Sequence, residues 1–221
     1  MQYNINQIME LLENTHVKNI QNILEIVGER IEGNLLCDKI PSNYIIHETI
    51  DKIRNLQYLC KGKKKICEIG INACHSLLIM LLENPDADYL LFDLNNHRYT
   101  EPCLKYIRNS FPNTKISVVY GNSIETITKY VMEHVDDLNT YDLCHIDGGH
   151  TEDIFSVDYN NVKQLSKENS IVIFDDYDYG PIRDFVDKKV SNNEIIEYSD
   201  VGIKKTDRHF VYYYSREPRF Q

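Results

Sequence analysis

Polar side chains that could take part in binding or catalysis stand at the ends of five short apolar runs in this sequence. The runs are KKICEIG, YLLFDL, ISVVYG, YDLCHID and IVIFDD. The residues that close them are Glu68 and Gly70, Asp93, Asn122 and Ser123, Asp147 and His150, and Asp175 and Asp176. If the runs are parallel strands of one sheet, their carboxyl ends share a rim, and open α/β sheets bind ligands there. A turn-forming acid alone is weak evidence, but five strand ends in register indicate one shared site.

Three of these acids are predicted to hold a metal ion. Asp147, Asp175 and Asp176 would meet if the fourth and fifth runs are neighbours, and three hard oxygen ligands suit Mg²⁺. Without an ion, such carboxylates would repel one another and raise their own pKa values. His150 is then the predicted general base, because imidazole titrates near neutral pH. Turn chemistry is the alternative: DGGH could be a tight turn with glycines at positive φ. In the same way, residues 175–181 could be a solvated loop before a helix opened by Pro181.

The first three strand ends favour a nucleoside ligand. Gly70 would let a ligand approach the backbone, Asp93 could accept hydrogen bonds from ribose hydroxyls, and Asn122 and Ser123 could bind an adenine edge. A dinucleotide fingerprint needs three glycines before its helix, whereas EIGINACHS has one. A pyrophosphate-binding loop is therefore poorly supported.

The elements that must position these residues follow a βαβ pattern. The runs start near Ile66, Tyr89, Ile116, Tyr141 and Ile171, at separations of 23, 27, 25 and 30 residues, and helix-like patterns fill the gaps. Continuous apolar runs with helical crossovers predict a parallel sheet covered on both faces. Two further runs, 193–199 and 208–216, follow a predicted helix near 181–190 and could pair as a terminal hairpin, with VYYYS as an edge strand. We therefore expect a doubly wound, mostly parallel seven-stranded α/β sheet.

The first 60 residues are predicted to form a helical cap on a domain that spans 61–221. One short stripe comprises Ile5, Ile8, Met9 and Leu12, and a second comprises Val17, Ile20, Leu24, Val27 and Ile31. Such spacings of three and four predict amphipathic helices. A loop over 33–42 and a helix over about 47–59 complete the cap. The apolar stripe permits a homodimer without requiring one.

Composition narrows the class of protein. The 221 residues carry 24 basic and 34 acidic side chains, a net charge of −10, which argues against nucleic acid or an anionic membrane surface as a partner. None of the six cysteines forms a C-x-x-C pair, so we expect buried thiols in a reducing compartment. The longest apolar run, residues 77–82, is too short to cross a bilayer. A cytoplasmic protein is expected.

The strand-end motifs together resemble the class I S-adenosylmethionine-dependent methyltransferases. The nearest branch is that of the metal-dependent sugar and macrolide O-methyltransferases, related to catechol O-methyltransferase; the resemblance covers 65 to about 190, and HIDGGH followed by a strand ending in DD is its most specific part. It implies a Rossmann-like fold and cofactor contacts at Glu68, Gly70, Asn72, Ser76, Asp93, Asn122 and Ser123. Relatives usually carry a second glycine near Ala73 or Cys74, whose side chains are therefore expected close to the methionine end of the cofactor.

The resemblance implies methyl transfer to a hydroxyl of a small molecule, a sugar or glycoside by expectation. A metal held by Asp147, Asp175 and Asp176 would lower the pKa of that hydroxyl, and His150 would take its proton. Two other hypotheses stay open at this point: a non-catalytic binding module on the same scaffold, and, less favoured, an NAD-dependent oxidoreductase. His145 is expected to be a core histidine, and His75 to pack at the start of the first helix.

Overall fold

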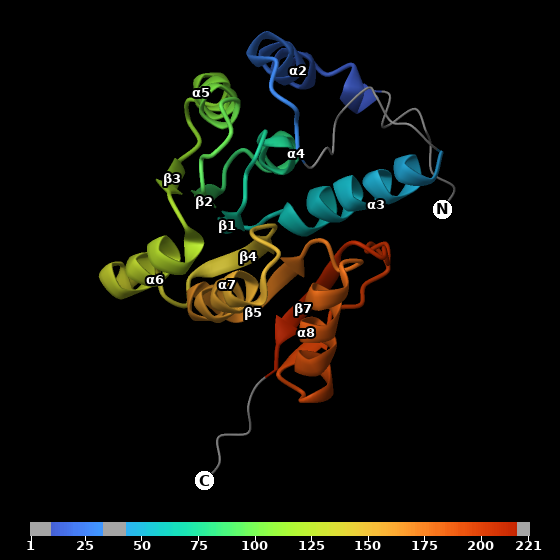
Figure 1. Cartoon of the computed structure of the whole chain (residues 1–221), viewed down its shortest axis with the longest axis vertical. Helices are drawn as coiled ribbons and strands as arrows, with labels where there is room; N and C mark the ends of the chain where they lie inside the picture. Colours follow the sequence, from blue (N-terminus) through green and yellow to red (C-terminus); the bar gives the residue numbers. More distant parts are fainter. Residues whose placement is uncertain (1–9, 33–42, 216–221) are drawn as a thin grey trace.

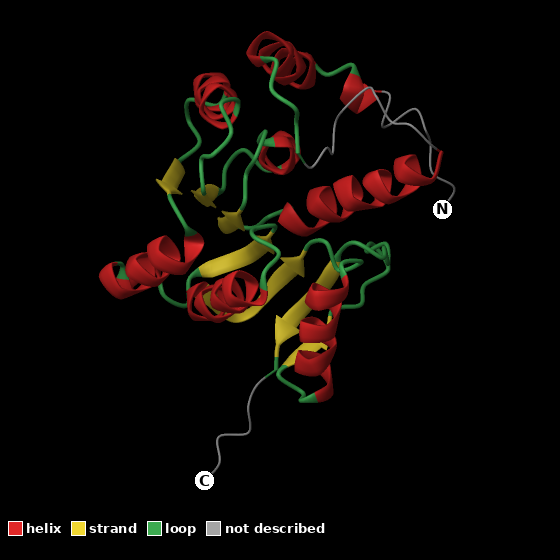
Figure 2. Ribbon diagram, viewed as in Figure 1, coloured by secondary structure: helices red, strands yellow, loops and turns green. Residues whose placement is uncertain are grey.

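The computed structural model describes residues 10–32 and 43–215, with the side chains of 43–48 left aside. One sheet of seven strands lies between two layers of helices (Figures 1 and 2). The strands are β1 (Lys65–Ile69), β2 (Asp88–Asp93), β3 (Ile116–Tyr120), β4 (Tyr141–Ile146), β5 (Ser166–Phe174), β6 (Ile195–Glu197) and β7 (Phe210–Tyr214). The helices are α2 (Thr15–Val27), α3 (Asn43–Cys60), α4 (His75–Glu83), α5 (Thr100–Ser110), α6 (Ser123–Glu133), α7 (Glu152–Leu165) and α8 (Gly180–Ser191), with a 3₁₀ turn, η1 (Val135–Asp137).

The strand order is β3-β2-β1-β4-β5-β7-β6, and β1 to β5 are parallel. This confirms the predicted doubly wound sheet and all five predicted strands. The order reverses between β1 and β4, so the crevice beyond their carboxyl ends is the expected place for a ligand. β7 runs antiparallel to β5 and β6.

The last two strands form the expected hairpin, but VYYYS was wrongly predicted as the edge. β7 lies between β5 and β6, and β6 is the outer strand. Tyr212 is completely buried and contacts the aromatic rings of Tyr159 and Tyr214. A large aromatic side chain gains most from burial when sheet lies on both sides of its strand, which explains the inner position.

Successive side chains of each strand point to opposite faces of the sheet and so contribute to two hydrophobic cores. Ile66, Leu91 and Leu143 face the layer of α2 to α5, whereas Cys67, Leu90 and Cys144 face α6, α7 and α8. Figure 1 shows these two layers on opposite sides of the sheet. The crossovers thus hold β1, β2 and β4 between two apolar surfaces.

The described part of the predicted N-terminal cap consists of α2 and α3. Val17, Ile20 and Leu24 are the buried face of α2, as the spacing predicted. The helix stops before Ile31, because Gly28 adopts φ 65° and its N–H bonds to the carbonyl of Leu24, the usual left-handed helix end. Ile5, Ile8, Met9 and the predicted loop over 33–42 fall outside the described residues. The boundary at residue 60 stays a prediction.

α3 and α8 confirm the predicted helices over 47–59 and 181–190, and Pro181 stands in the first turn of α8. Among the described residues, no helix is both long and apolar enough to cross a membrane. Five of the six cysteines lie in the described residues, and all five are buried and free of disulfides. Cys37 lies outside those residues.

Candidate active site at the strand ends

The loops that follow β1 and β4 touch at the point where the strand order reverses. Gly70 has φ 82°, and a Cβ atom built on it would lie 1.9 Å from the carbonyl oxygen of Asp147. Only glycine fits such a backbone approach. The N–H of Asp147 in turn donates to the carbonyl of Ile69 at 2.8 Å. Gly70 therefore fixes the two loops against each other and places Asp147 at the crevice.

A pocket of about 320 Å³ opens over these loops, a volume in the range of small-molecule and cofactor sites. Five of the seven residues expected to contact a cofactor line it: Gly70, Asn72, Asp93, Asn122 and Ser123. Leu94, Asn96 and Ile154 add further lining that the strand-end argument did not reach. The strand ends thus form one concave site, as the shared rim required.

Asp93 organises this pocket through its carboxylate. Oδ2 accepts the N–H groups of Ile71 and Asn72 at 2.9 and 3.0 Å, and Oδ1 accepts that of Asn95 at 2.6 Å. A carboxylate held by three backbone donors keeps one orientation. The acid at the end of β2 is therefore rigid and faces the pocket, and lone pairs remain for a ligand hydroxyl.

Asn122 has a structural task in addition to the expected one. It is the N-cap of α6, and its Oδ1 accepts the N–H of Ile124 at 3.0 Å. Such a cap satisfies one of the free N–H groups at a helix start. The Nδ2 group is the part of this side chain that can donate to a ligand.

Glu32 and His97 were missed by the sequence reasoning. Both line the large pocket, and the carboxylate of Glu32 lies 3.4 Å from Nε2 of His97. Asn72 is held in place by the carbonyl of Glu32 and by the hydroxyl of Tyr99, both at 2.5 Å. These contacts form only when the chain after α2 folds over the rim, so no local pattern in the sequence marks them.

Glu68 and Ser76 lie outside the large pocket. Glu68 is completely buried, and its Oε1 lies 2.9 Å from Nδ1 of His145. A direct cofactor contact by Glu68 is therefore not what this geometry offers. Ser76 instead lines a smaller cavity of about 70 Å³ together with His75, Ala73 and Lys52. Of the two residues near the expected second glycine, neither Ala73 nor Cys74 lines the large pocket. Cys74 is completely buried at the left-handed φ of 61°.

The three predicted metal ligands come together. Asp147, Asp175 and Asp176 each offer a carboxylate oxygen, and these atoms lie within 4.8 Å of one another. Burial and the neighbouring Asp175 raise the pKa of Asp147 to about 8. The neighbouring carboxylates of Asp175 and Asp176 add negative charge beside Asp147 that a cation would offset. The three oxygens therefore suit a divalent cation in both geometry and charge.

Fixed cations already balance part of that charge. Nζ of Lys52 lies 2.5 Å from Oδ2 of Asp175, and Arg208 pairs with Asp176. Although burial acts to raise it, the pKa of Asp175 lies well below its usual range because of Lys52 and His209. Neither cation was predicted from the sequence, since α3 and the chain before β7 reach the site only through tertiary folding.

His150 stands at the mouth of the cluster with half of its side chain exposed. Its Nε2 lies 2.7 Å from Oδ2 of Asp176, and this hydrogen bond raises the pKa of His150 above its ordinary value. The tight-turn alternative for DGGH is wrong, because neither Gly148 nor Gly149 has a positive φ. Their missing side chains serve packing: a Cβ would lie 2.8 Å from Asp158 or from Ile154, respectively. The solvated-loop alternative is wrong for Asp175, which is 2% exposed.

His145 is buried, as expected, but it is more than a core residue. It lies between the carboxylates of Glu68 and Asp175. Burial acts to lower its pKa, yet these two acids raise it to about 10. His75 is also buried, and burial lowers its pKa to about 4. His75 is thus neutral at pH 7 and lines the smaller cavity.

Comparisons with known proteins agree with this site. A family model described as a methyltransferase domain matches residues 67–177. The fold is similar to an O-methyltransferase of Bacillus cereus in complex with SAH (14% identity, TM-score 0.65, 92% of this chain and 91% of that chain). It is also similar to the O-methyltransferase TomG of Streptomyces achromogenes in complex with SAM (13%, 0.64, 92% and 91%). A third similar structure is a putative caffeoyl-CoA O-methyltransferase of Staphylococcus aureus (15%, 0.58, 92% and 94%). No curated protein sequence matches the chain.

Proposed function

Because the chain belongs to this methyltransferase-domain family, we propose that it is an S-adenosylmethionine-dependent O-methyltransferase. The acceptor is a hydroxyl of a small molecule, with a sugar or glycoside as the expected class. The observation that carries the proposal is the adjacency of two sites: the nucleoside-sized pocket and the acid cluster share Asp147, and His150 of the pocket lining contacts Asp176 of the cluster. A donor and an acceptor can thus meet across one residue.

The large pocket would hold the cofactor. Asp93 accepts hydrogen bonds from the ribose hydroxyls, Asn122 donates from Nδ2 to the adenine edge, and Gly70 leaves room beside the loop. Asn72 lines both this pocket and the smaller cavity and would contact the methionine end of the cofactor. Complexes with SAM and SAH among the similar folds support this choice of cofactor.

The acid cluster would hold Mg²⁺ through Asp147, Asp175 and Asp176. Such an ion supplies positive charge that lowers the pKa of an acceptor hydroxyl. His150 donates its Nε2–H to Asp176, so Nδ1 carries the lone pair that accepts the hydroxyl proton. The oxygen forms a bond to the methyl carbon as the bond from that carbon to sulfur breaks. The electron pair stays on sulfur and leaves S-adenosylhomocysteine.

The two other hypotheses are less well supported. A non-catalytic scaffold would need a blocked cofactor loop, yet the side chains of Ala73 and Cys74 stay out of the large pocket. An NAD-dependent oxidoreductase would need a pyrophosphate-binding loop, and the single glycine at position 70 does not provide one. A cytoplasmic location, the absence of nucleic-acid and membrane partners, and a homodimer stay predictions.

Calorimetry with S-adenosylmethionine tests the cofactor site first. Asp93→Asn should weaken binding at least about tenfold, since one charged acceptor is lost, and the exposed Asp86→Asn is the matched control. A protein that binds no S-adenosylmethionine would refute the proposal. Transfer of a labelled methyl group to a panel of sugars, glycosides and catechols then identifies the acceptor. Transfer to amines alone would refute the assignment to oxygen.

A further inference from the structure

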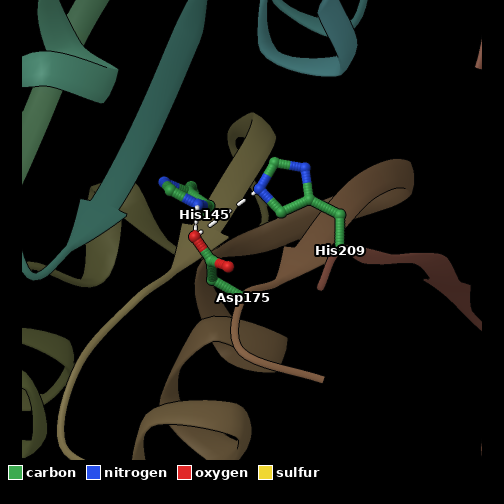
Figure 3. A group of neighbouring side chains, drawn as sticks. All are labelled: His145, Asp175 and His209. Atoms are coloured by element: carbon green, nitrogen blue, oxygen red, sulfur yellow. Dashed lines mark ion pairs between the residues drawn. The ribbon is translucent and has the colours of Figure 1, made fainter. Parts of the chain in front are cut away.

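Two buried histidines that the proposed reaction does not use form a second cluster with Asp175, which is also one of the proposed Mg²⁺ ligands. Figure 3 shows that His145 on β4, Asp175 at the end of β5 and His209 just before β7 turn toward one another. The side chains of both histidines are fully buried, and that of Asp175 is 1% exposed. Each offers one ligand atom, and the three atoms lie within 4.8 Å of one another.

The two histidine nitrogens of this cluster have no hydrogen bond to any described residue. Nε2 of His145 and Nε2 of His209 are buried atoms without a hydrogen-bond partner. They lie 3.6 and 3.5 Å from Oδ2 of Asp175, which is too long for a hydrogen bond between nitrogen and oxygen. Buried polar atoms without a hydrogen bond are costly even where an ion pair faces them, so two of them beside one carboxylate call for a physical reason.

A metal ion supplies that reason. Ligand atoms about 2.0–2.2 Å from a tetrahedral ion lie roughly 3.3–3.6 Å from one another, and the separations of the two histidine nitrogens from Oδ2 of Asp175 are at this spacing. We propose that His145, His209 and Asp175 form a buried binding site for a divalent transition-metal ion of the Zn²⁺ type. Imidazole nitrogen favours such ions over Mg²⁺.

Glu68 contacts the ring nitrogen of His145 that faces away from Asp175. Its Oε1 lies 2.9 Å from Nδ1 of His145. A carboxylate on the far nitrogen of a metal-binding histidine orients the ring and leaves the lone pair on the near nitrogen. Metal binding would release the proton from Nε2 of His145, and this nitrogen would then face Asp175 as a ligand. The proposal thus gives Glu68, which lies outside both pockets, a defined role.

A cavity of about 130 Å³ lies on the side of His209 and is lined by His209, Val211 and residues between 197 and 205. The competitor at the site is Lys52, whose ammonium group already lies 2.5 Å from Oδ2 of Asp175. Removal of this charge should strengthen metal binding.

Co²⁺ titration of the metal-free full-length protein tests the site, since tetrahedral Co²⁺ absorbs intensely in the visible range and octahedral Co²⁺ weakly. We expect one equivalent with the tetrahedral spectrum. His209→Gln should lose it, and Glu68→Gln should bind Co²⁺ about 10–100-fold more weakly. Asp147→Asn is the matched control: it removes a ligand of the proposed Mg²⁺ site and should keep the spectrum. These readouts do not depend on methyl transfer.

Two outcomes would overturn the proposal. One is a wild-type protein with no tetrahedral band; the other is a band that Asp147→Asn abolishes and His209→Gln retains, which would place the ion at the acid cluster alone. Circular dichroism checks that each variant folds. If His209→Gln does not fold, zinc X-ray absorption of the wild type decides, because two imidazole rings support the site and oxygen scatterers alone contradict it. Lys52→Met should bind Co²⁺ more tightly than the wild type.

Discussion

His150 is the residue at which the proposed chemistry can be tested most directly. The hydrogen bond from Nε2 to Asp176 raises its pKa above the ordinary 6.5. A base acts only in its neutral form, so the rate should fall as the pH drops through this raised pKa. We predict that His150→Gln lowers kcat about 10²–10⁴-fold and removes this acidic limb of the pH profile.

Steady-state kinetics over about pH 5 to 9, a range that brackets the pKa of histidine, measures the effect. Calorimetry should show that the variant binds S-adenosylmethionine as the wild type does, since half of the His150 side chain points to solvent at the pocket mouth. A variant with nearly full kcat would exclude His150 as the base. Weakened cofactor binding would instead assign it to the donor site.

At the scale of single residues, the acids of the site were predictable from the sequence, whereas the residues that surround and pair with them were not. Asp147, Asp175 and Asp176 could be placed because parallel strands put their carboxyl ends on one rim. Lys52, Arg208 and Glu32 could not, since they come from helices and loops whose approach to the rim depends on tertiary packing. The family resemblance implied a cofactor contact at Glu68, whereas its side chain forms a buried pair with His145.

Among the elements, the two loops at the reversal of strand order are coupled by a glycine. A methyl group at position 70 would overlap the carbonyl of Asp147, and φ is 82° there. Gly70→Ala should therefore destabilise the fold by about 3 kcal/mol or more, from backbone strain and displacement of the β4 loop. Urea unfolding measures the loss. Gly180→Ala is a control, because a Cβ there meets open space, and equal effects of the two changes would contradict the coupling.

The start of α6 separates a capping role from a binding role in one side chain. Asn122→Asp keeps an oxygen for the N–H of Ile124 and loses the Nδ2 donor. We predict unchanged stability, because Asp and Asn cap equally well, and cofactor binding weakened about five- to tenfold by one lost hydrogen bond. Asn122→Ala should lose both, with about 1 kcal/mol of stability. Thermal unfolding and calorimetry report the two effects, and full affinity in Asn122→Asp would remove adenine recognition from this residue.

The secondary structure was predictable where its signal is local. Apolar runs such as 141–146 predict strands that are buried on both faces, and the spacing of Val17, Ile20 and Leu24 predicts the buried face of a helix. The order of β6 and β7 was not predictable in the same way. Antiparallel strands can join a sheet edge in either order, and burial of Tyr212 against Tyr159 decides it, which is a contact between distant segments.

At the scale of the whole molecule, one buried acid should make a distinct contribution to the pH dependence of stability. Asp158 on α7 is completely buried under Gly148, and burial raises the pKa of its carboxyl from 3.8 to about 6. Between these values the native state holds a proton that the unfolded chain has released. The contribution of Asp158 to stability is therefore greatest below the lower value and falls as the pH rises toward the upper one, by about 3 kcal/mol at most.

Asp158→Asn removes this dependence because an amide of the same shape has no charge to desolvate. The variant should exceed the wild type by about 2–3 kcal/mol at pH 8, and the difference should shrink as the pH falls toward about 4. Urea unfolding at both pH values measures it, and the exposed Asp86→Asn should show no such trend. A wild type that is the more stable protein at pH 8 would mean that ionised Asp158 has a partner. The Ser123 hydroxyl, which lowers the pKa of Asp158, would then bind the carboxylate more strongly than burial opposes it, and the floor of the cofactor pocket would be held by that pair.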